Sequence, residues 1–123
     1  MDFAVPNSDL RFAIPDNWWH FCELRDFHPQ SEFFPYTRAS TSAYAVPISQ
    51  IDPPQRDGGM PPFKKYKMVP VLLAFTSPEC QIPPVHVERA SAERHAYRVP
   101  NSYDRFYASI AVGYSKLPIL VKE

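Results

Sequence analysis

The sequence predicts one small α+β domain, a mixed β-sheet with packed helices. Two observations carry this prediction. The last third of the chain alternates short extended segments with an amphipathic helix. The 123 residues, 45% of them hydrophobic, suffice for one modest core and no second domain. Thirteen Lys and Arg balance thirteen Asp and Glu, so no net charge attracts a polyanion or an anionic membrane, and neither is an expected partner.

The last third of the chain contains the most regular patterns. Residues 84–88 and 95–99 alternate in polarity around a polar segment, which predicts a hairpin. Residues 101–112 place aromatic and aliphatic side chains on one helical face, and Asn101 or Ser102 would cap the helix. Gly113 is positioned to end this helix in a left-handed conformation, and residues 117–121 then read as an apolar strand.

The middle of the chain predicts a short strand, a loop and a helix. Residues 46–59 combine prolines and glycines after the strand, which favours a loop. Residues 63–75 carry apolar side chains at helical spacing, and Pro70 either kinks this helix or marks its beginning. We interpret the basic run of this segment as a solvated helix face rather than a nucleic-acid site; it comprises Lys64, Lys65, Tyr66 and Lys67.

Residues 1–45 are aromatic and punctuated by prolines, and we expect them to form an extension packed on the core. Asp16 or Asn17 is placed to cap a short helix. The tryptophans at its start, Trp18 and Trp19, form either a lid packed over the sheet or an exposed aromatic patch for a partner.

The second half of the chain resembles the ParB/sulfiredoxin-like superfamily over residues 46–121. The prolines and arginine of residues 51–56 resemble the first conserved box of that superfamily. The second box, a helix opening with an arginine, then a glycine and a proline-containing strand, corresponds to Ser102-Tyr103-Asp104-Arg105, Ala108-Ser109, Gly113 and Leu117-Pro118-Ile119. The resemblance implies an extension at residues 1–45 and a ParB/sulfiredoxin-like core at residues 46–123.

The resemblance implies a nucleotide site, in which the helix N-terminus holds phosphates. The ligand would be ATP or CTP with Mg²⁺, and weak hydrolysis of the nucleotide would be compatible with this fold. By this resemblance, the residues that would contact the nucleotide are Arg56, Ser102, Tyr103, Asp104 and Arg105. In the alternative hypothesis, the chain is a non-catalytic protein-interaction module on the same scaffold, with a degenerate nucleotide site.

Two substitutions make the second box degenerate. Ser102 replaces the glycine that lets a phosphate approach the backbone, and Asp104 replaces a basic group and would repel a phosphate. Asp104 also suits a purely structural role near a helix cap, and Arg105 suits a surface ion pair. Tyr103 stands where sulfiredoxins carry their cysteine, so that chemistry has no nucleophile here. No catalytic residue is assigned, and whether the protein is an enzyme is left open.

The remaining expectations concern metals, compartment and DNA. Neither grouping of His and Cys has a zinc-like spacing, so no metal site is expected. The N-terminus lacks a basic region before an apolar stretch, which favours the cytoplasm and reduced cysteines. The chain ends at Glu123 without space for a helix-turn-helix domain, so sequence-specific DNA binding is not expected.

Overall fold

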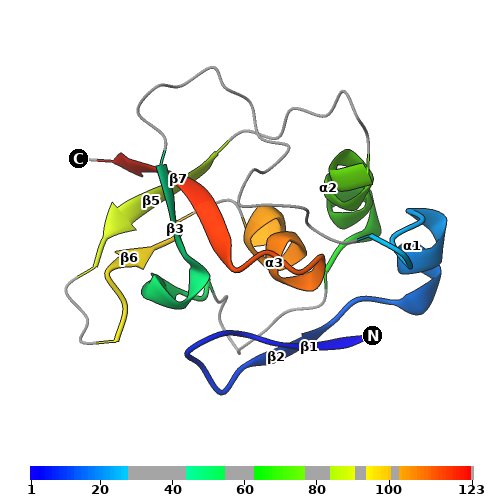
Figure 1. The fold of residues 1–123 in the computed structure, drawn as a ribbon, viewed down its shortest axis with the longest axis horizontal. Coiled ribbons are helices and arrows are strands. Elements are labelled where there is room, and N and C mark those ends of the chain that lie inside the picture. The colour runs from blue at the N-terminus through cyan, green and yellow to red at the C-terminus, as the bar shows by residue number, and fades with distance from the viewer. Residues whose placement is uncertain (28–43, 55–62, 77–83, 91–93, 101–102, 123) are drawn as a thin grey trace.

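The computed structural model describes residues 1–27, 44–54, 63–76, 84–90, 94–100 and 103–122 (Figure 1). Its strands are β1 (Asp2–Ala4), β2 (Arg11–Ala13), β3 (Tyr44–Pro47), β4 (Ile51–Asp52), β5 (Val85–Arg89), β6 (Tyr97–Arg98) and β7 (Lys116–Lys122). Its helices are α1 (Asp16–Phe21), α2 (Lys65–Thr76), α3 (Tyr103–Ala111) and the short 3-10 helix Ile48–Gln50.

Five strands form a mixed sheet in the order β3-β7-β5-β6-β4. β7 is antiparallel to β3 and parallel to β5, β5 is antiparallel to β6, and β6 is parallel to β4. The predicted α+β class with a mixed sheet is therefore confirmed. The predicted hairpin is confirmed as β5 and β6: Glu88 pairs with Arg98 in the register, and Arg98 Nε donates to Glu88 Oε2 at 2.8 Å.

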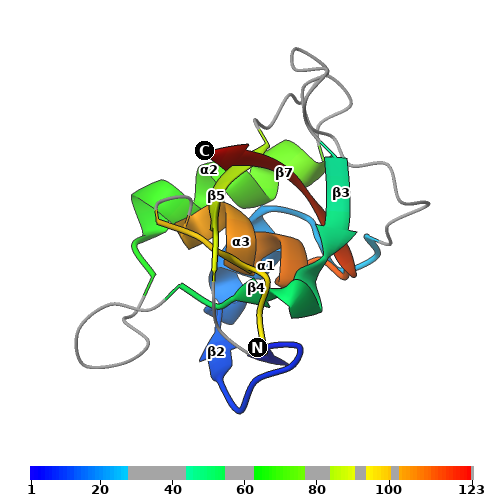
Figure 2. The same ribbon diagram turned by 90° about the vertical axis from the view of Figure 1, so that its left-hand side faces the viewer.

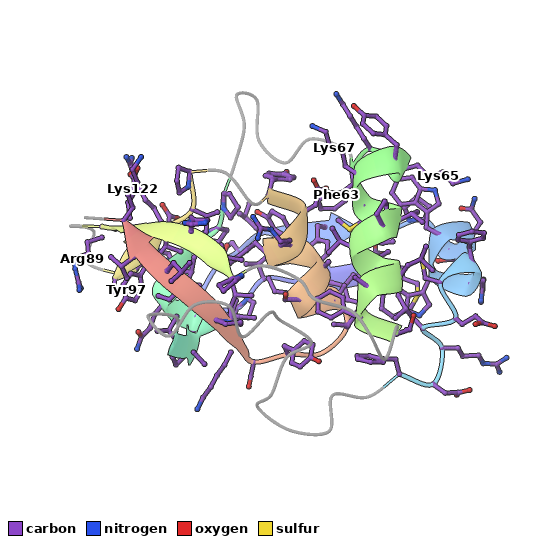
Figure 3. All side chains as sticks on the ribbon, turned by 90° about the horizontal axis from the view of Figure 1, so that it is seen from above. Phe63, Lys65, Lys67, Arg89, Tyr97 and Lys122 are labelled. Atoms are coloured by element: carbon purple, nitrogen blue, oxygen red, sulfur yellow. The ribbon has the colours of Figure 1, made fainter. Side chains whose placement is uncertain are left out.

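The helices form layers on one side of this sheet. α3 lies against the sheet, α2 lies beyond α3, and α1 lies outermost, as Figures 1 and 3 show; Figure 2 views the same arrangement from the side of the sheet. The amphipathic pattern of α3 explains its central place, because Phe106, Tyr107 and Ala108 are fully buried. Gly113 ends α3 with a φ of 105°, as predicted.

Two predictions for the middle of the chain need correction. Pro70 does not begin the second helix, because α2 starts five residues earlier and continues past it. Pro70 has no N–H to donate to the carbonyl oxygen of Tyr66, so α2 lacks one backbone hydrogen bond there, and the ring lies on the exposed side of the helix. The segment after β3 is also not all loop: the 3-10 turn is followed by β4, which completes the sheet beside β6.

The N-terminal segment contains a hairpin that the sequence analysis missed. β1 and β2 pair around a turn in which Asn7 has a φ of 54°. Phe12 and Ile14 are buried, and the Phe12 ring lies 5.0 Å from the ring of Tyr107 in α3. The hairpin thus shares the core of the sheet and helices. The division of the chain at residue 45 stays a prediction.

The predicted cap of α1 is wrong. Pro15 occupies the N-cap without a side-chain hydrogen bond. Asp16 instead accepts from the amino group of Met1 at 2.8 Å, and this bond holds the pKa of the Asp16 carboxyl below its usual value. The carboxylate is therefore committed to the chain terminus rather than to the helix backbone.

One tryptophan of α1, Trp19, packs on the N-terminal hairpin. Trp19 is buried, with its ring 5.6 Å from that of Phe3. Phe21 is 64% exposed. Trp19 was expected to cover the sheet, and it instead contacts Phe3 of β1. The exposed aromatic side chain of α1 is that of Phe21. Among the described residues, no helix has the length and apolar character to span a bilayer.

Candidate functional site

The candidate site begins at the first turn of α3. Tyr103, Asp104 and Arg105 occupy this turn and are all partly buried. Arg105 Nη1 donates to the carbonyl oxygen of Pro84 at 3.1 Å. Pro84 directly precedes β5, so this bond ties the guanidinium to the start of a central strand. The N-terminal end of α3 is therefore fixed relative to the sheet.

The start of α2 lies beside the start of α3. The ring of Phe63, two residues before α2, lies 5.7 Å from the ring of Tyr103. At the opposite end, the ring of Phe75 lies 5.7 Å from the ring of Tyr114, which follows α3. The two helices therefore run parallel, with their N-termini at one edge of the molecule (Figure 3).

This arrangement concentrates positive potential at one edge. The first turn of a helix has unpaired N–H groups and a partial positive charge, and two such ends lie together here. The exposed cations at the start of α2 add to it; they are Lys64, Lys65 and Lys67. Within the described residues, none of the three forms an ion pair with a carboxylate. The Lys64 and Lys67 ammonium groups each lie 6.0 Å from the centre of the Tyr66 ring.

An aromatic cluster closes the space beneath the paired helix starts. The ring of Tyr107 lies 5.5 Å from that of Phe63 and 5.0 Å from that of Tyr103. The Tyr107 hydroxyl donates to the carbonyl oxygen of Pro54 at 2.7 Å. Burial, with smaller contributions from Tyr103 and Asp52, raises the pKa of Tyr107, so this hydroxyl stays protonated and acts as a structural donor.

The structure describes three of the five predicted contact residues. Tyr103, Asp104 and Arg105 lie together because they share one helical turn. Arg56 and Ser102 lie outside the described residues, so the predicted convergence of two arginines stays a prediction. Asp104 places a carboxylate in the first turn, which stabilises the helix through its dipole and opposes the binding of an anion.

The structure also shows a pair that the sequence analysis missed. His86 is exposed, whereas the His95 side chain is only 11% exposed and its Nδ1 lies 3.7 Å from Asp52 Oδ1. His86 and His95 therefore do not meet across the hairpin. The reason is that His95 precedes β6, and β6 runs parallel to β4, which carries Asp52. A two-residue strand leaves no pattern in the sequence that would have indicated this pairing.

His95 and Asp52 do not belong to a larger cluster of metal ligands. Across the residues described by the structure, no three side chains of His, Cys, Asp or Glu are grouped to hold a metal ion. The His95 Nε2 atom is buried and has no hydrogen-bond partner there.

Comparison with known proteins finds similarity among solved structures. No protein-family model matches the chain, and no curated protein matches it. Among solved structures, the chain is similar to the crystal structure of the C-terminally truncated chromosome-partitioning protein ParB from Caulobacter crescentus complexed with CTP-gamma-S. The TM-score is 0.48 and the identity 19%, over 66% of this chain and 44% of the ParB chain. The chain thus spans less than half of that protein, and the degenerate second box stays a prediction.

Proposed function

We propose that this protein binds a nucleotide or another phosphate-containing ligand at the edge where α2 and α3 begin. The observation that carries the proposal is the parallel, side-by-side placement of the two helix starts, set by the contact between Phe63 and Tyr103. Backbone N–H groups at helix N-termini bind phosphate oxygens because they lack partners within the helix and lie at the positive end of its dipole.

The side chains proposed to contact the ligand come from two parts of the chain. Tyr103, Asp104 and Arg105 come from the first turn of α3, and Ser102 precedes them in the sequence. Arg56 follows in sequence the proline segment whose Pro54 is bonded to α3 through Tyr107. An arginine suits this task because its planar guanidinium donates two parallel hydrogen bonds to a phosphate. The bond from Arg105 to Pro84 keeps that guanidinium beside the helix start. ATP or CTP with Mg²⁺ is the proposed ligand.

Nucleotide binding is tested by thermal and chemical unfolding in the presence of ATP, CTP, GTP or ADP with magnesium. A ligand at 100 times its dissociation constant should raise the free energy of unfolding by about 2.7 kcal/mol. Arg105→Ala should abolish this increase. Because the substitution also removes the bond to Pro84, titration calorimetry on folded Arg105→Lys, which keeps the charge but not the planar fork, should show weaker binding.

Arg11→Ala is the matched control, because Arg11 is exposed on β2 in the N-terminal hairpin. This variant should bind as tightly as the unchanged protein. The proposal is overturned if none of the four nucleotides stabilises the protein, or if Arg11→Ala and Arg105→Ala weaken binding equally.

Asp104 gives a second test with an effect of opposite sign. Asp104→Asn removes a negative charge from the proposed phosphate site, so the nucleotide should bind about 3 to 10 times more tightly. The same substitution removes a favourable charge from the first turn of α3 and should lower the free energy of unfolding of the free protein by about 0.5 kcal/mol. Calorimetry and urea unfolding measure the two effects separately. An unchanged or weaker affinity would show that the phosphate is not bound beside this carboxylate.

A further inference from the structure

The N-terminal hairpin reaches the aromatic cluster beneath the two helix starts. The side chain of Phe12, in β2, is only 4% exposed. Its ring lies 5.0 Å from that of Tyr107 and 5.8 Å from that of Phe63, edge to face with each. Figure 1 shows the blue strands β1 and β2 below α3, on the side from which Phe12 approaches. The hairpin therefore adds a fourth ring to the cluster of Phe63, Tyr103 and Tyr107.

The position of Phe63 depends on its contacts with the other rings of this cluster. Phe63 lies two residues before α2, so the regular backbone hydrogen bonds of the helix do not fix it. Its partly buried ring lies 5.7 Å from that of Tyr103 and 5.5 Å from that of Tyr107, and Phe12 is its third neighbour. Aromatic pairs favour particular angles, so each neighbour restricts the orientation of Phe63. Phe12 thus helps to set the start of α2 against the start of α3.

The hairpin is held in place by packing rather than by the main sheet. In the part of the chain that the structure describes, β1 and β2 form a separate two-stranded sheet, and neither strand joins the five-stranded sheet. A two-stranded hairpin alone is at best marginally stable in water. Its order therefore depends on side chains such as Phe12, and opening of the hairpin withdraws this ring from beneath Phe63 and Tyr107.

We infer that Phe12 is a positioning residue for the proposed phosphate site, and that the hairpin and a bound nucleotide stabilise each other. This inference rests on the proposed function. A ligand held by the starts of both α2 and α3 favours the arrangement in which Phe63 is fixed. Withdrawal of Phe12 releases that arrangement. By thermodynamic linkage, the ligand opposes opening of the hairpin by the same factor by which opening weakens its binding.

Phe12 acts through its neighbours and does not contact the ligand. Its ring is buried beneath Phe63 and Tyr107, whereas the proposed phosphate contacts lie at the helix starts. Phe12 also belongs to residues 1–45, outside the part of the chain that resembles the ParB/sulfiredoxin-like superfamily. The N-terminal extension would then contribute to ligand binding, a role that the resemblance does not imply.

Hydrogen exchange on the unchanged full chain tests the linkage directly. Exchange of the backbone amides that join β1 to β2 is measured with and without the nucleotide that stabilises the protein most, at 100 times its dissociation constant. If opening of the hairpin abolishes binding, these amides should exchange about 100 times more slowly with the ligand. An unchanged exchange rate would show that the hairpin opens while the site stays intact, and would overturn the inference.

Phe12→Leu tests the role of the ring itself. The variant loses both edge-to-face contacts, and titration calorimetry should show nucleotide binding about 3 to 10 times weaker than in the unchanged protein. Trp19→Leu is the matched control, because Trp19 is buried and its ring lies 5.6 Å from that of Phe3, one ring farther from the site. It should lower the melting temperature but leave the affinity unchanged. Circular dichroism identifies a temperature at which both variants are folded.

A measurement without ligand separates this inference from the proposed function. Phe12→Leu should shift the NMR signals of the Phe63 ring, because the ring current of Phe12 is lost, and Trp19→Leu should not. If no nucleotide binds the unchanged protein, the proposed site and this inference both fail. If nucleotide binds Phe12→Leu as tightly as the unchanged protein, the inference alone fails. Should Phe12→Leu not fold, the exchange measurement on the unchanged protein decides.

Discussion

The buried hydroxyl of Tyr107 gives a prediction at the scale of one residue. Tyr107→Phe removes the donor to the Pro54 carbonyl and should lower the free energy of unfolding at pH 7 by about 1 to 2 kcal/mol. Urea unfolding measures this loss. Tyr66→Phe is the control, because the Tyr66 side chain is exposed, and it should leave the free energy of unfolding unchanged.

The same residue predicts how stability depends on alkaline pH. Burial raises the pKa of Tyr107 in the folded protein, so in the unfolded chain this phenol ionises first. Its stabilising contribution is complete below about pH 10, the ordinary tyrosine pKa, and is lost as the pH rises above that value. The difference in unfolding free energy between the unchanged protein and Tyr107→Phe should therefore shrink between pH 7 and about pH 10.5. A difference that grows with pH would contradict the burial of this hydroxyl.

Residue roles were predictable where their cause is local. Gly113 could be assigned from its place after an amphipathic segment, because helix termination depends on a few neighbouring residues. Asp16 could not, since its partner is the amino group of Met1, 15 positions away. The role of His95 could not be predicted either, because its neighbour Asp52 lies far away in the sequence and is brought close only by the pairing of β4 with β6.

The end of α3 gives a prediction at the scale of an element. Gly113 has a φ of 105°, which a side chain with a Cβ atom disfavours. Gly113→Ala should therefore lower the free energy of unfolding by about 1 to 2 kcal/mol. Gly113→Asn should lower it less, because asparagine tolerates positive φ. Thermal and urea unfolding measure both, and Ser115→Ala, at an exposed position two residues later, is the control. Equal losses for alanine and asparagine would contradict this explanation.

Elements were predictable in proportion to their length and regularity. The hairpin of β5 and β6, the helix α3 and the strand β7 follow from polarity patterns and end signals in one stretch of chain. β4 was missed because two residues cannot show an alternation, and its pairing with β6 joins segments 46 positions apart. The same limit applies to the candidate site. The first turn of α3 was predictable from the helical pattern of residues 101–112. Its parallel neighbour α2 was not, because a contact between two rings 40 positions apart sets that arrangement.

At the scale of the whole molecule, the N-terminal hairpin closes the core beside α3, below that helix in Figure 1. It is fastened at its turn by Asn7, whose side-chain amide donates to the carbonyl oxygens of Ser49 and Arg94, both at 3.0 Å. Arg94 donates in return to the Asn7 carbonyl oxygen at 3.0 Å. Residues of the predicted extension and of the predicted core thus hold each other in place.

This dependence predicts that residues 1–14 are required for folding rather than appended to a stable core. Their deletion removes the buried side chains of Val5, Phe12 and Ile14, and the shortened chain should lose its cooperative thermal transition. Phe12→Ala alone should lower the free energy of unfolding by about 3 to 5 kcal/mol, since it leaves a cavity beside Tyr107.

Asn7→Gly keeps the positive φ but loses the side-chain hydrogen bonds to Ser49 and Arg94, and should lower the free energy of unfolding by about 1 kcal/mol. Arg11→Ala, on the exposed side of β2, should have no effect. A shortened chain that still unfolds cooperatively at an unchanged temperature would show instead that the hairpin is a separate appendage, as a boundary at residue 45 implies.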